Sequence, residues 1–265
     1  MPRCPPRTRL LPRRTNRLLR IDSFQFFTPD HPPEHLGPIL ARNRFDGSIA
    51  IALHPADFRH LLALTRDHAF VKAAIPAVDL DDPKLPLLLD ELASFPKFRG
   101  VFHRLGDAVP PGLSELARRN LSLDLQLGPE QLPVAAGIAA RHPELRLAIL
   151  HLGSPAIASG PSGEWARDIA ALARFPQVFC KASNLIQLAP APWKGADLRP
   201  FVQHVLAAFS PARVMFGSGW PAGLPGHIWK EALALFTQSV GAQPMDVREE
   251  LLGGAAQRFY AIPTL

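Results

Sequence analysis

The segment IDSFQFFTPDHPPEH (residues 21–35) decides between the folds open to this chain. It opens with a short apolar run typical of a buried strand, and Pro29 then ends that strand. A doubly wound open sheet needs a glycine-rich turn directly after its first strand. No glycine follows this strand before Gly37, so the segment argues against the doubly wound fold.

Downstream of this segment, short apolar runs alternate with longer segments of helical periodicity. In residues 55–68 the side chains of Phe58, Leu61, Leu62 and Thr65 recur with helical spacing. Residues 129–142 and 163–175 have the same character. The predicted strands are Ile21–Phe27, Ser48–Leu53, Val71–Val78, Arg99–His103, Leu121–Leu127, Leu147–Leu152, Val178–Ala182 and Val214–Gly217.

The predicted strands are rich in Ala, Val, Ile and Leu, which indicates burial on both faces and hence a parallel sheet. Eight strand–helix units in about 200 residues leave only short connections. The sequence therefore predicts an α/β fold, a (β/α)8 TIM barrel that forms a single domain over residues 21–265.

The net charge of +6 comes from one end of the chain. Residues 1–20 hold seven arginines and no acidic residue, which leaves the remainder near neutral. A nucleic-acid surface would spread over the folded body, so we expect no nucleic-acid partner. We expect residues 1–20 to be a basic, disordered tail, with an organelle-targeting leader as the alternative.

Cysteine content and hydropathy set the expected compartment. The chain has two cysteines, Cys4 and Cys180, too few for a disulfide framework, which favours the cytoplasm. No uncharged apolar run reaches the roughly 18 residues that a membrane helix needs, so we expect no membrane partner.

Chemistry in a parallel barrel is carried by the carboxyl ends of its strands. The candidates that this rule selects are Phe24, Phe26, His103, Arg104, Asp124, Gln126, His151, Lys181, Ser183, Ser218, Gly219 and Trp220. Of these, Asp124 is either a general base or the buried partner of Lys181. Arg104 either holds a substrate carboxylate or pairs with Asp107 at the rim.

The chain resembles the amidohydrolase-related lactonases, the fuconolactonase-like and pyrone-dicarboxylate lactonase-like enzymes. The segments that carry this resemblance span residues 21–260 and read IDSFQFF, FRGVFHRLGD, LSLDLQLGPEQLP, LRLAILHLGSP, FPQVFCKASNL, ARVMFGSGWP and LLGGAAQRFY. The resemblance implies a barrel hydrolase that acts on lactones or small cyclic esters.

Five positions depart from the motifs of that family, one of them Ser154, where its members typically have a lysine. Its members typically have histidines at the first strand, where this chain has Phe24 and Phe26, and an aspartate that activates water where this chain has Gly219. Ala255 replaces an expected asparagine, whereas His151 is retained. Phenylalanine offers no lone pair to a cation, so we expect no metal at the standard site and no other cofactor.

Two hypotheses about function follow. In the first, the hydrolytic site is lost and the barrel binds a small molecule, a lactone or a carboxylate, with Phe24 and Phe26 as an apolar floor or as core filling. In the second, a metal-independent lactonase uses His151 with Asp124, Arg104 or Lys181, while His103 and Trp220 contact substrate. The sequence does not indicate an oligomeric state.

Overall fold

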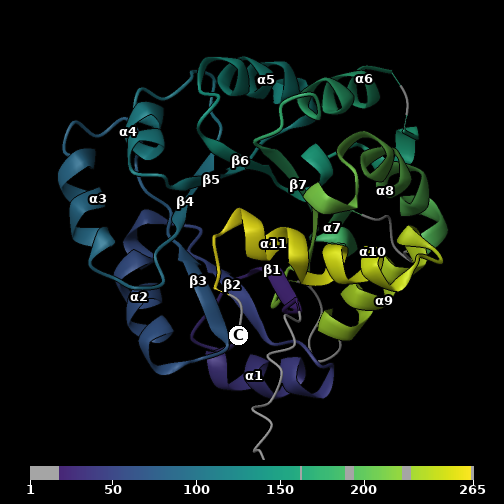
Figure 1. Ribbon diagram of the computed structural model, residues 1–265, viewed down its shortest axis with the longest axis horizontal. Coiled ribbons are helices and arrows are strands. Elements are labelled where there is room, and N and C mark those ends of the chain that lie inside the picture. The colour runs from purple at the N-terminus through teal and green to yellow at the C-terminus, as the bar shows by residue number, and fades with distance from the viewer. Residues whose placement is uncertain (1–17, 162, 189–193, 223–227, 264–265) are drawn as a thin grey trace, which may run out of the picture.

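The computed structural model describes residues 18–161, 163–188, 194–222 and 228–263, and within them eight parallel strands alternate with helices (Figure 1). The strands are β1 (Ile21–Gln25), β2 (Gly47–Ile51), β3 (Val71–Ile75), β4 (Gly100–Arg104), β5 (Ser122–Gln126), β6 (Arg146–Ile149), β7 (Val178–Ser183) and β8 (Val214–Gly217). Each predicted strand is confirmed, and its ends differ from the prediction by no more than three residues.

Helices connect the strands and most of them lie outside the ring, whereas the last helix lies across one end of it (Figure 1). They are α1 (Pro33–Arg42), α2 (Phe58–Asp67), α3 (Leu85–Ala93), α4 (Leu113–Arg118), α5 (Leu132–Arg141), α6 (Gly163–Leu172), α7 (Leu185–Leu188), α8 (Gly195–Phe209), α9 (Ile228–Val240), α10 (Met245–Glu249) and α11 (Ala255–Phe259). A π-helical turn, Glu250–Gly254, joins the last two. In the described part of the chain, no helix combines the length and apolar character needed to cross a membrane.

Two of the predicted helical segments begin as tighter turns. Pro55 and Pro129 each open a short 3-10 turn, and the α-helices themselves start at Phe58 and Leu132. Proline suits such a start because its fixed φ is helical and its missing N–H would have no partner there. The buried face of α2, which contains Leu61, is the face that the spacing predicted.

The strands form two parallel ladders, β1-β2-β3 and β4-β5-β6-β7-β8, which backbone bonds join at two seams. At the seam between β3 and β4, the Phe102 N–H donates to the Pro76 carbonyl at 2.9 Å. At the seam between β8 and β1, the Gly219 N–H donates to the Phe24 carbonyl at 3.0 Å. The ring of strands is the predicted (β/α)8 barrel.

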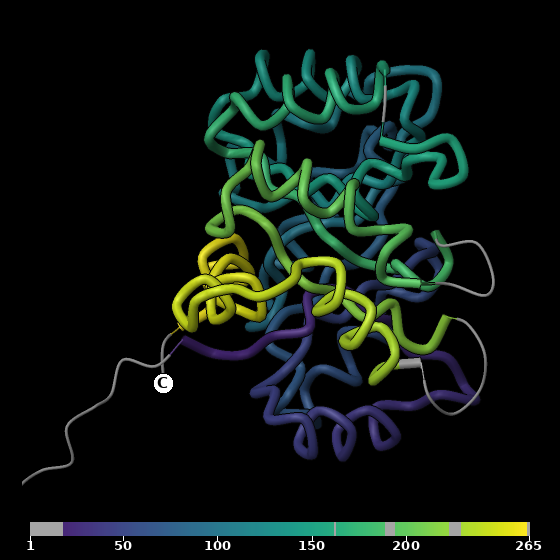
Figure 2. The backbone as a smooth tube through the Cα atoms, turned by 90° about the vertical axis from the view of Figure 1, so that its right-hand side faces the viewer, coloured from purple at the N-terminus to yellow at the C-terminus, as the bar shows by residue number. Residues whose placement is uncertain are grey.

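Alternation along each strand divides the core into two apolar clusters. In β2, Ile49 and Ile51 pack inside the barrel, whereas Ala50 between them packs against the surrounding helices. Phe259, the last residue of α11, and Tyr260, which follows it, belong to the inner cluster. Figure 2 shows this helix at one end of the barrel, where the Arg146 guanidinium at the start of β6 donates to the Phe259 carbonyl.

A network of fully buried polar groups crosses the barrel interior. The Tyr260 hydroxyl donates to the carboxylate of Asp124, with 2.7 Å to Oδ2 and 2.8 Å to Oδ1. Lys181 Nζ lies 2.6 Å from Asp124 Oδ2 and donates to the Ser23 carbonyl at 2.7 Å. The predicted pairing of Asp124 with Lys181 is confirmed.

The packed body of the protein begins before residue 21. Leu19 is 2% exposed, and its N–H donates to Gln257 Oε1 at 3.1 Å. The Arg20 N–H donates to Asp46 Oδ2 at 2.8 Å. The expected boundary of the tail at residue 20 is therefore too late by at least two residues, because Leu19 adds apolar surface to the core. Residues 1–17 lie outside the described part of the chain.

We predict that removing one partner of the Asp124–Lys181 pair destabilises the barrel strongly. Asp124→Asn or Lys181→Met alone should lower the free energy of unfolding by about 3–5 kcal/mol, because each leaves a buried charge unpaired. The double variant should recover much of this loss. Urea unfolding followed by circular dichroism measures all three.

Asp168→Asn is the matched control, because it breaks the Arg167–Asp168 pair, in which the arginine is 67% exposed. Its expected cost is about 1 kcal/mol or less. Single variants of Asp124 and Lys181 that cost no more than Asp168→Asn would contradict a central role for the buried pair.

Candidate functional site

The carboxyl end of β6 carries His151 in a turn of unusual backbone conformation. Consecutive residues here have positive φ, with His151 at 55°, Leu152 at 58° and Gly153 at 71°. Two contacts hold the turn: the Trp165 indole N–H donates to the Leu152 carbonyl at 2.9 Å, and Ser183 Oγ lies 2.9 Å from His151 Nδ1. Such strain in residues other than glycine is typical of functional sites.

His151 is buried and uncharged. Its side chain is 4% exposed. Burial, together with the positive charge of Lys181, lowers the pKa of His151 to about 3. The imidazole is therefore neutral at physiological pH, so it can donate or accept a hydrogen bond and cannot deliver a proton as an imidazolium.

The Phe24 ring fills the space between His151 and Lys181. Its edge meets the imidazole with ring centroids 4.8 Å apart and planes at 84°, and Lys181 Nζ lies 5.7 Å from the Phe24 centroid. The side chain is 3% exposed. Phe24 therefore lies against both the retained histidine and the buried lysine.

Phe26 is more exposed than Phe24, although residues two positions apart on a strand share a face. Phe26 is half-buried, packs against the inner cluster and lines a surface pocket. Both phenylalanines thus face the inner cluster, and Phe26 is the more exposed of the two because β1 ends at Gln25.

The side chains at this end of the barrel do not fit a divalent cation. His151 supplies one nitrogen, and Phe24 and Phe26 supply no donor atom, whereas a structural or catalytic metal ion needs at least three protein ligands. Within the described ranges, no group of three or more His, Cys, Asp or Glu side chains is placed to share an ion.

Gly219 follows β8 in a conformation that disfavours a side chain. Its φ is +76°, and a Cβ atom there would lie 2.6 Å from Asn184 Oδ1. An aspartate at this position would therefore require Asn184 to move. The chain has no carboxylate at the position where the family resemblance places its water-activating residue.

Asp22 is a buried residue of this end that sequence reasoning did not select. Its carboxylate accepts hydrogen bonds from the Ser218 N–H (2.8 Å), the Ser218 hydroxyl (2.6 Å), the Trp229 indole (2.8 Å) and the Phe24 N–H (3.3 Å). Burial raises the pKa of Asp22, and these donors oppose the shift. The signal in the sequence that could have identified Asp22 was an acidic residue within the first apolar strand. Its carboxylate links β1 to Ser218, directly after β8, and to Trp229 of α9.

Asp124 lies in the barrel interior. Its side chain is 0% exposed, and both of its oxygens accept hydrogen bonds from Tyr260. Among the described contacts, none joins Asp124 to His151. Asp124 therefore accepts a hydrogen bond from Lys181, and the Lys181 ammonium lies over the Phe24 ring.

The two candidates that end β4 occupy different environments. His103 is half-buried, and burial lowers its pKa while Asp81 and Asp79 raise it. Arg104 is exposed and shares a strand face with Phe102 of the inner cluster, which places it at the carboxyl end of the barrel. No ion pair between Arg104 and Asp107 is present among the described residues.

Trp220 follows β8 and is 6% exposed. Its indole makes edge contacts with Phe27 and His31, at centroid separations of 6.1 and 5.7 Å. The Trp220 carbonyl accepts the Phe26 N–H at 3.0 Å. Trp220 therefore supports the segment after β1 that carries Phe26 and Phe27.

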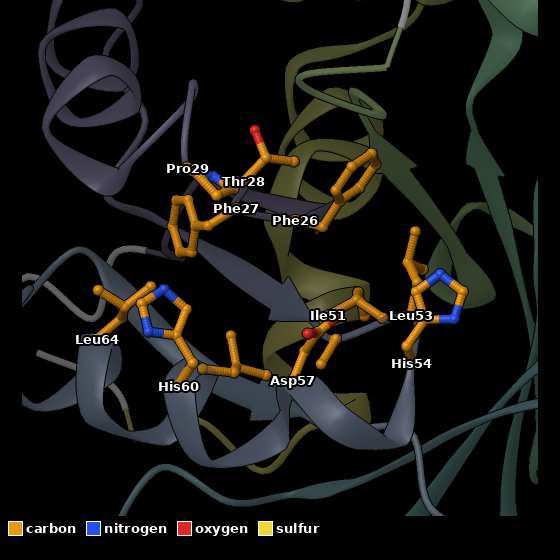
Figure 3. Close-up of a pocket in the computed structure, with 12 residues that line it drawn as sticks. Phe26, Phe27, Thr28, Pro29, Ile51, Leu53, His54, Asp57, His60 and Leu64 are labelled. Atoms are coloured by element: carbon orange, nitrogen blue, oxygen red, sulfur yellow. The ribbon is translucent and has the colours of Figure 1, made fainter.

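A pocket of about 350 Å³ opens between that segment and α2 (Figure 3). Its lining is mainly apolar, with polar side chains on the helical side. The residues that line it are Phe26, Phe27, Thr28, Pro29, Ile51, Ala52, Leu53, His54, Asp57, His60, Leu61 and Leu64. Neither His151 nor Asp124 is among them, so the pocket lies apart from the retained histidine.

We predict that His151 makes the protein less stable in acid. The unfolded imidazole takes up a proton as the pH falls below about 6.5, and the buried imidazole takes one up only near pH 3. Stability from this group is therefore lost as the pH falls through that interval, by about 2–3 kcal/mol between pH 7 and pH 4.5. Urea unfolding at the two pH values measures the loss.

His151→Gln should flatten this pH dependence, whereas His35→Gln, at an exposed position of α1, should leave it unchanged. Equal pH dependence in wild type and His151→Gln would show that the imidazole is not kept neutral by burial.

Comparisons with known proteins agree with the fold and with the strand-end motifs. The amidohydrolase family profile matches residues 49–262 of this chain. An L-fucono-1,5-lactonase from Burkholderia ambifaria is 32% identical over 258 residues, with 88% of this chain and 86% of the relative covered. A solved amidohydrolase from Burkholderia multivorans with bound Zn has a TM-score of 0.82 at 29% identity, over 92% of this chain and 100% of that one.

A solved protein from Pseudomonas putida, described as a 2-pyrone-4,6-dicarboxylic acid hydrolase, shares the fold. Its TM-score is 0.79 at 19% identity, and 92% of this chain and 98% of that one are covered. The resemblance drawn from the motifs is thus confirmed: the chain belongs to the amidohydrolase family, on its lactonase-type branch.

Proposed function

We propose that this chain is a lactonase-type amidohydrolase homologue that binds a small molecule at the carboxyl end of its barrel and does not hydrolyse it. The observation that carries the proposal is the position of Phe24. Its ring is in contact with His151 and covers Lys181, where hydrolysis would need a metal ligand or a charged group.

Three further features support loss of hydrolysis. Gly219 provides no group to take a proton from water. Asp124 already accepts hydrogen bonds from Tyr260 and Lys181 within the barrel. The imidazole of His151, with its pKa lowered to about 3, is a weak base at neutral pH. A missing general base alone reduces rates by about 10²–10⁴.

Binding of a small molecule is supported by the open end of the barrel. Phe26 lines a pocket, and Arg104 is exposed at the carboxyl end of β4, where it is available to a lactone carbonyl. A solved relative from Burkholderia multivorans, at 28% identity and a TM-score of 0.81, holds HEPES.

A metal-independent lactonase is the second candidate function. It is favoured by the retention of His151 in a strained turn and by relatives named as L-fucono-1,5-lactonases. In it, neutral His151 would hydrogen-bond the lactone carbonyl or orient water, and Arg104 would stabilise the oxyanion. Lys181 and Asp124 contribute to this mechanism only if Phe24 moves aside.

Two expectations about the whole chain belong to the same proposal. A cytoplasmic location rests on the low cysteine content, and the described cysteine, Cys180, is buried and free. A single barrel domain with a basic tail rests on the composition of the first residues and on the packing that begins at Leu19.

Hydrolysis of L-fucono-1,5-lactone, simpler γ- and δ-lactones and an aryl ester tests the proposal. Wild-type protein, with and without EDTA, should give no turnover above buffer. The product acid is titrated with a pH indicator, and circular dichroism confirms that the protein is folded.

Two variants distinguish the alternatives. If turnover resists EDTA, disappears in His151→Gln and persists in His35→Gln, the proposal is wrong and the protein is a metal-independent lactonase. Turnover abolished by EDTA in wild type would overturn both readings of the site, because the described residues do not fit a metal ion.

A further inference from the structure

The pocket between β1 and α2 has a buried apolar floor and an exposed polar rim. Ile51 and Leu61 on the floor are 1% and 4% exposed. Phe26 and Phe27 form the half-buried wall on the β1 side, and Figure 3 shows the Phe27 ring facing His60 and Leu64 of α2. A volume of about 350 Å³ is within the range of sites that enclose small organic molecules.

The polar side chains on the α2 side of the rim, Asp57, His54 and His60, have no hydrogen-bond or ion-pair partner among the described residues. Asp57 precedes α2, and its carboxylate does not cap the helix or form an ion pair there. His54 and His60 likewise make no side-chain hydrogen bond within the described part of the chain, whereas His31 bonds to Thr28 and His68 pairs with Glu34. The rim therefore presents free hydrogen-bonding groups above an apolar floor.

The charge of the rim selects against anions. Asp57 is the acidic residue of the lining, and no lysine or arginine is among the residues that line the pocket. Arg59, the nearest cation along the chain, stacks on the Phe58 ring and faces Glu91, so it does not neutralise Asp57. A carboxylate or phosphate placed here would be repelled, whereas an amine or hydroxyl could donate to Asp57.

We propose that this pocket binds a flat, largely apolar molecule of one or two rings that carries a neutral or cationic hydrogen-bond donor, with the rings against Phe26 and Phe27 and the donor at Asp57. This proposal specifies the class of ligand for the small-molecule binding proposed above, and it depends on that binding function. Aromatic walls favour a flat ring system through edge-to-face and offset contacts. The preferred ligand thus differs from the dicarboxylates named for one of the structural relatives.

Three probes with one ring system and different charges test the assignment. They are 2-naphthylmethanol (neutral), 2-naphthylmethylamine (cationic) and 2-naphthoate (anionic), titrated into the full-length protein by isothermal titration calorimetry at pH 7.5. The neutral and cationic probes should bind, and the anionic probe should bind about tenfold more weakly than the cationic one.

Variants locate the binding. Phe26→Ala should weaken the cationic and neutral probes alike by about tenfold, because a ring contact is lost. Asp57→Asn should reduce the difference between cation and anion to about twofold. Asp67→Asn, exposed at the end of the same helix and outside the pocket, is the matched control and should leave the difference unchanged.

Equal or tighter binding of 2-naphthoate, or a charge preference that Asp57→Asn does not alter, would overturn the assignment, as would no binding of any probe. None of the three probes has a hydrolysable bond. Binding therefore stays interpretable if the lactone assay detects turnover, and failure of the pocket assignment leaves the result of that assay intact.

Discussion

The carboxylate of Asp124 is the group on which the barrel interior depends. It accepts hydrogen bonds from Tyr260 of the C-terminal segment and from Lys181 of β7, and Lys181 in turn reaches the backbone of β1. Elements far apart in sequence are thereby joined in the buried interior of the barrel. The same network influences His151 at the carboxyl end of β6, because the positive charge of Lys181 helps to lower the pKa of the imidazole.

The fold was predictable from the sequence to a much greater extent than the site. Eight apolar runs identified the strands because burial on both faces leaves a strong local pattern. The bonds of Asp22 and Tyr260 depend on contacts between residues more than a hundred positions apart in the sequence. Such contacts leave no periodic signal in the sequence. The pairing of Asp124 with Lys181 was predictable because a buried charge requires a partner.

The departures from the family motifs form a consistent local environment. Phe24 contributes its edge to His151 and its face to the side of Lys181, while Gly219 leaves room for Asn184 and donates its N–H to the Phe24 carbonyl. A single return to the family residue at either position would disturb these contacts. Lineage is therefore a better guide to the architecture of this protein than to its chemistry, which depends on the side chains that now occupy the strand ends.

The two seams of the barrel have a consequence for its internal motions. Within β1–β3 and within β4–β8 neighbouring strands pair as ladders, whereas isolated bridges connect the two arcs. Partial opening should therefore separate the arcs as cooperative units, and backbone amides at the seams should exchange with solvent before those of β5 to β7. One seam passes Phe24 and Gly219, so the candidate site borders the part of the barrel that opens most readily.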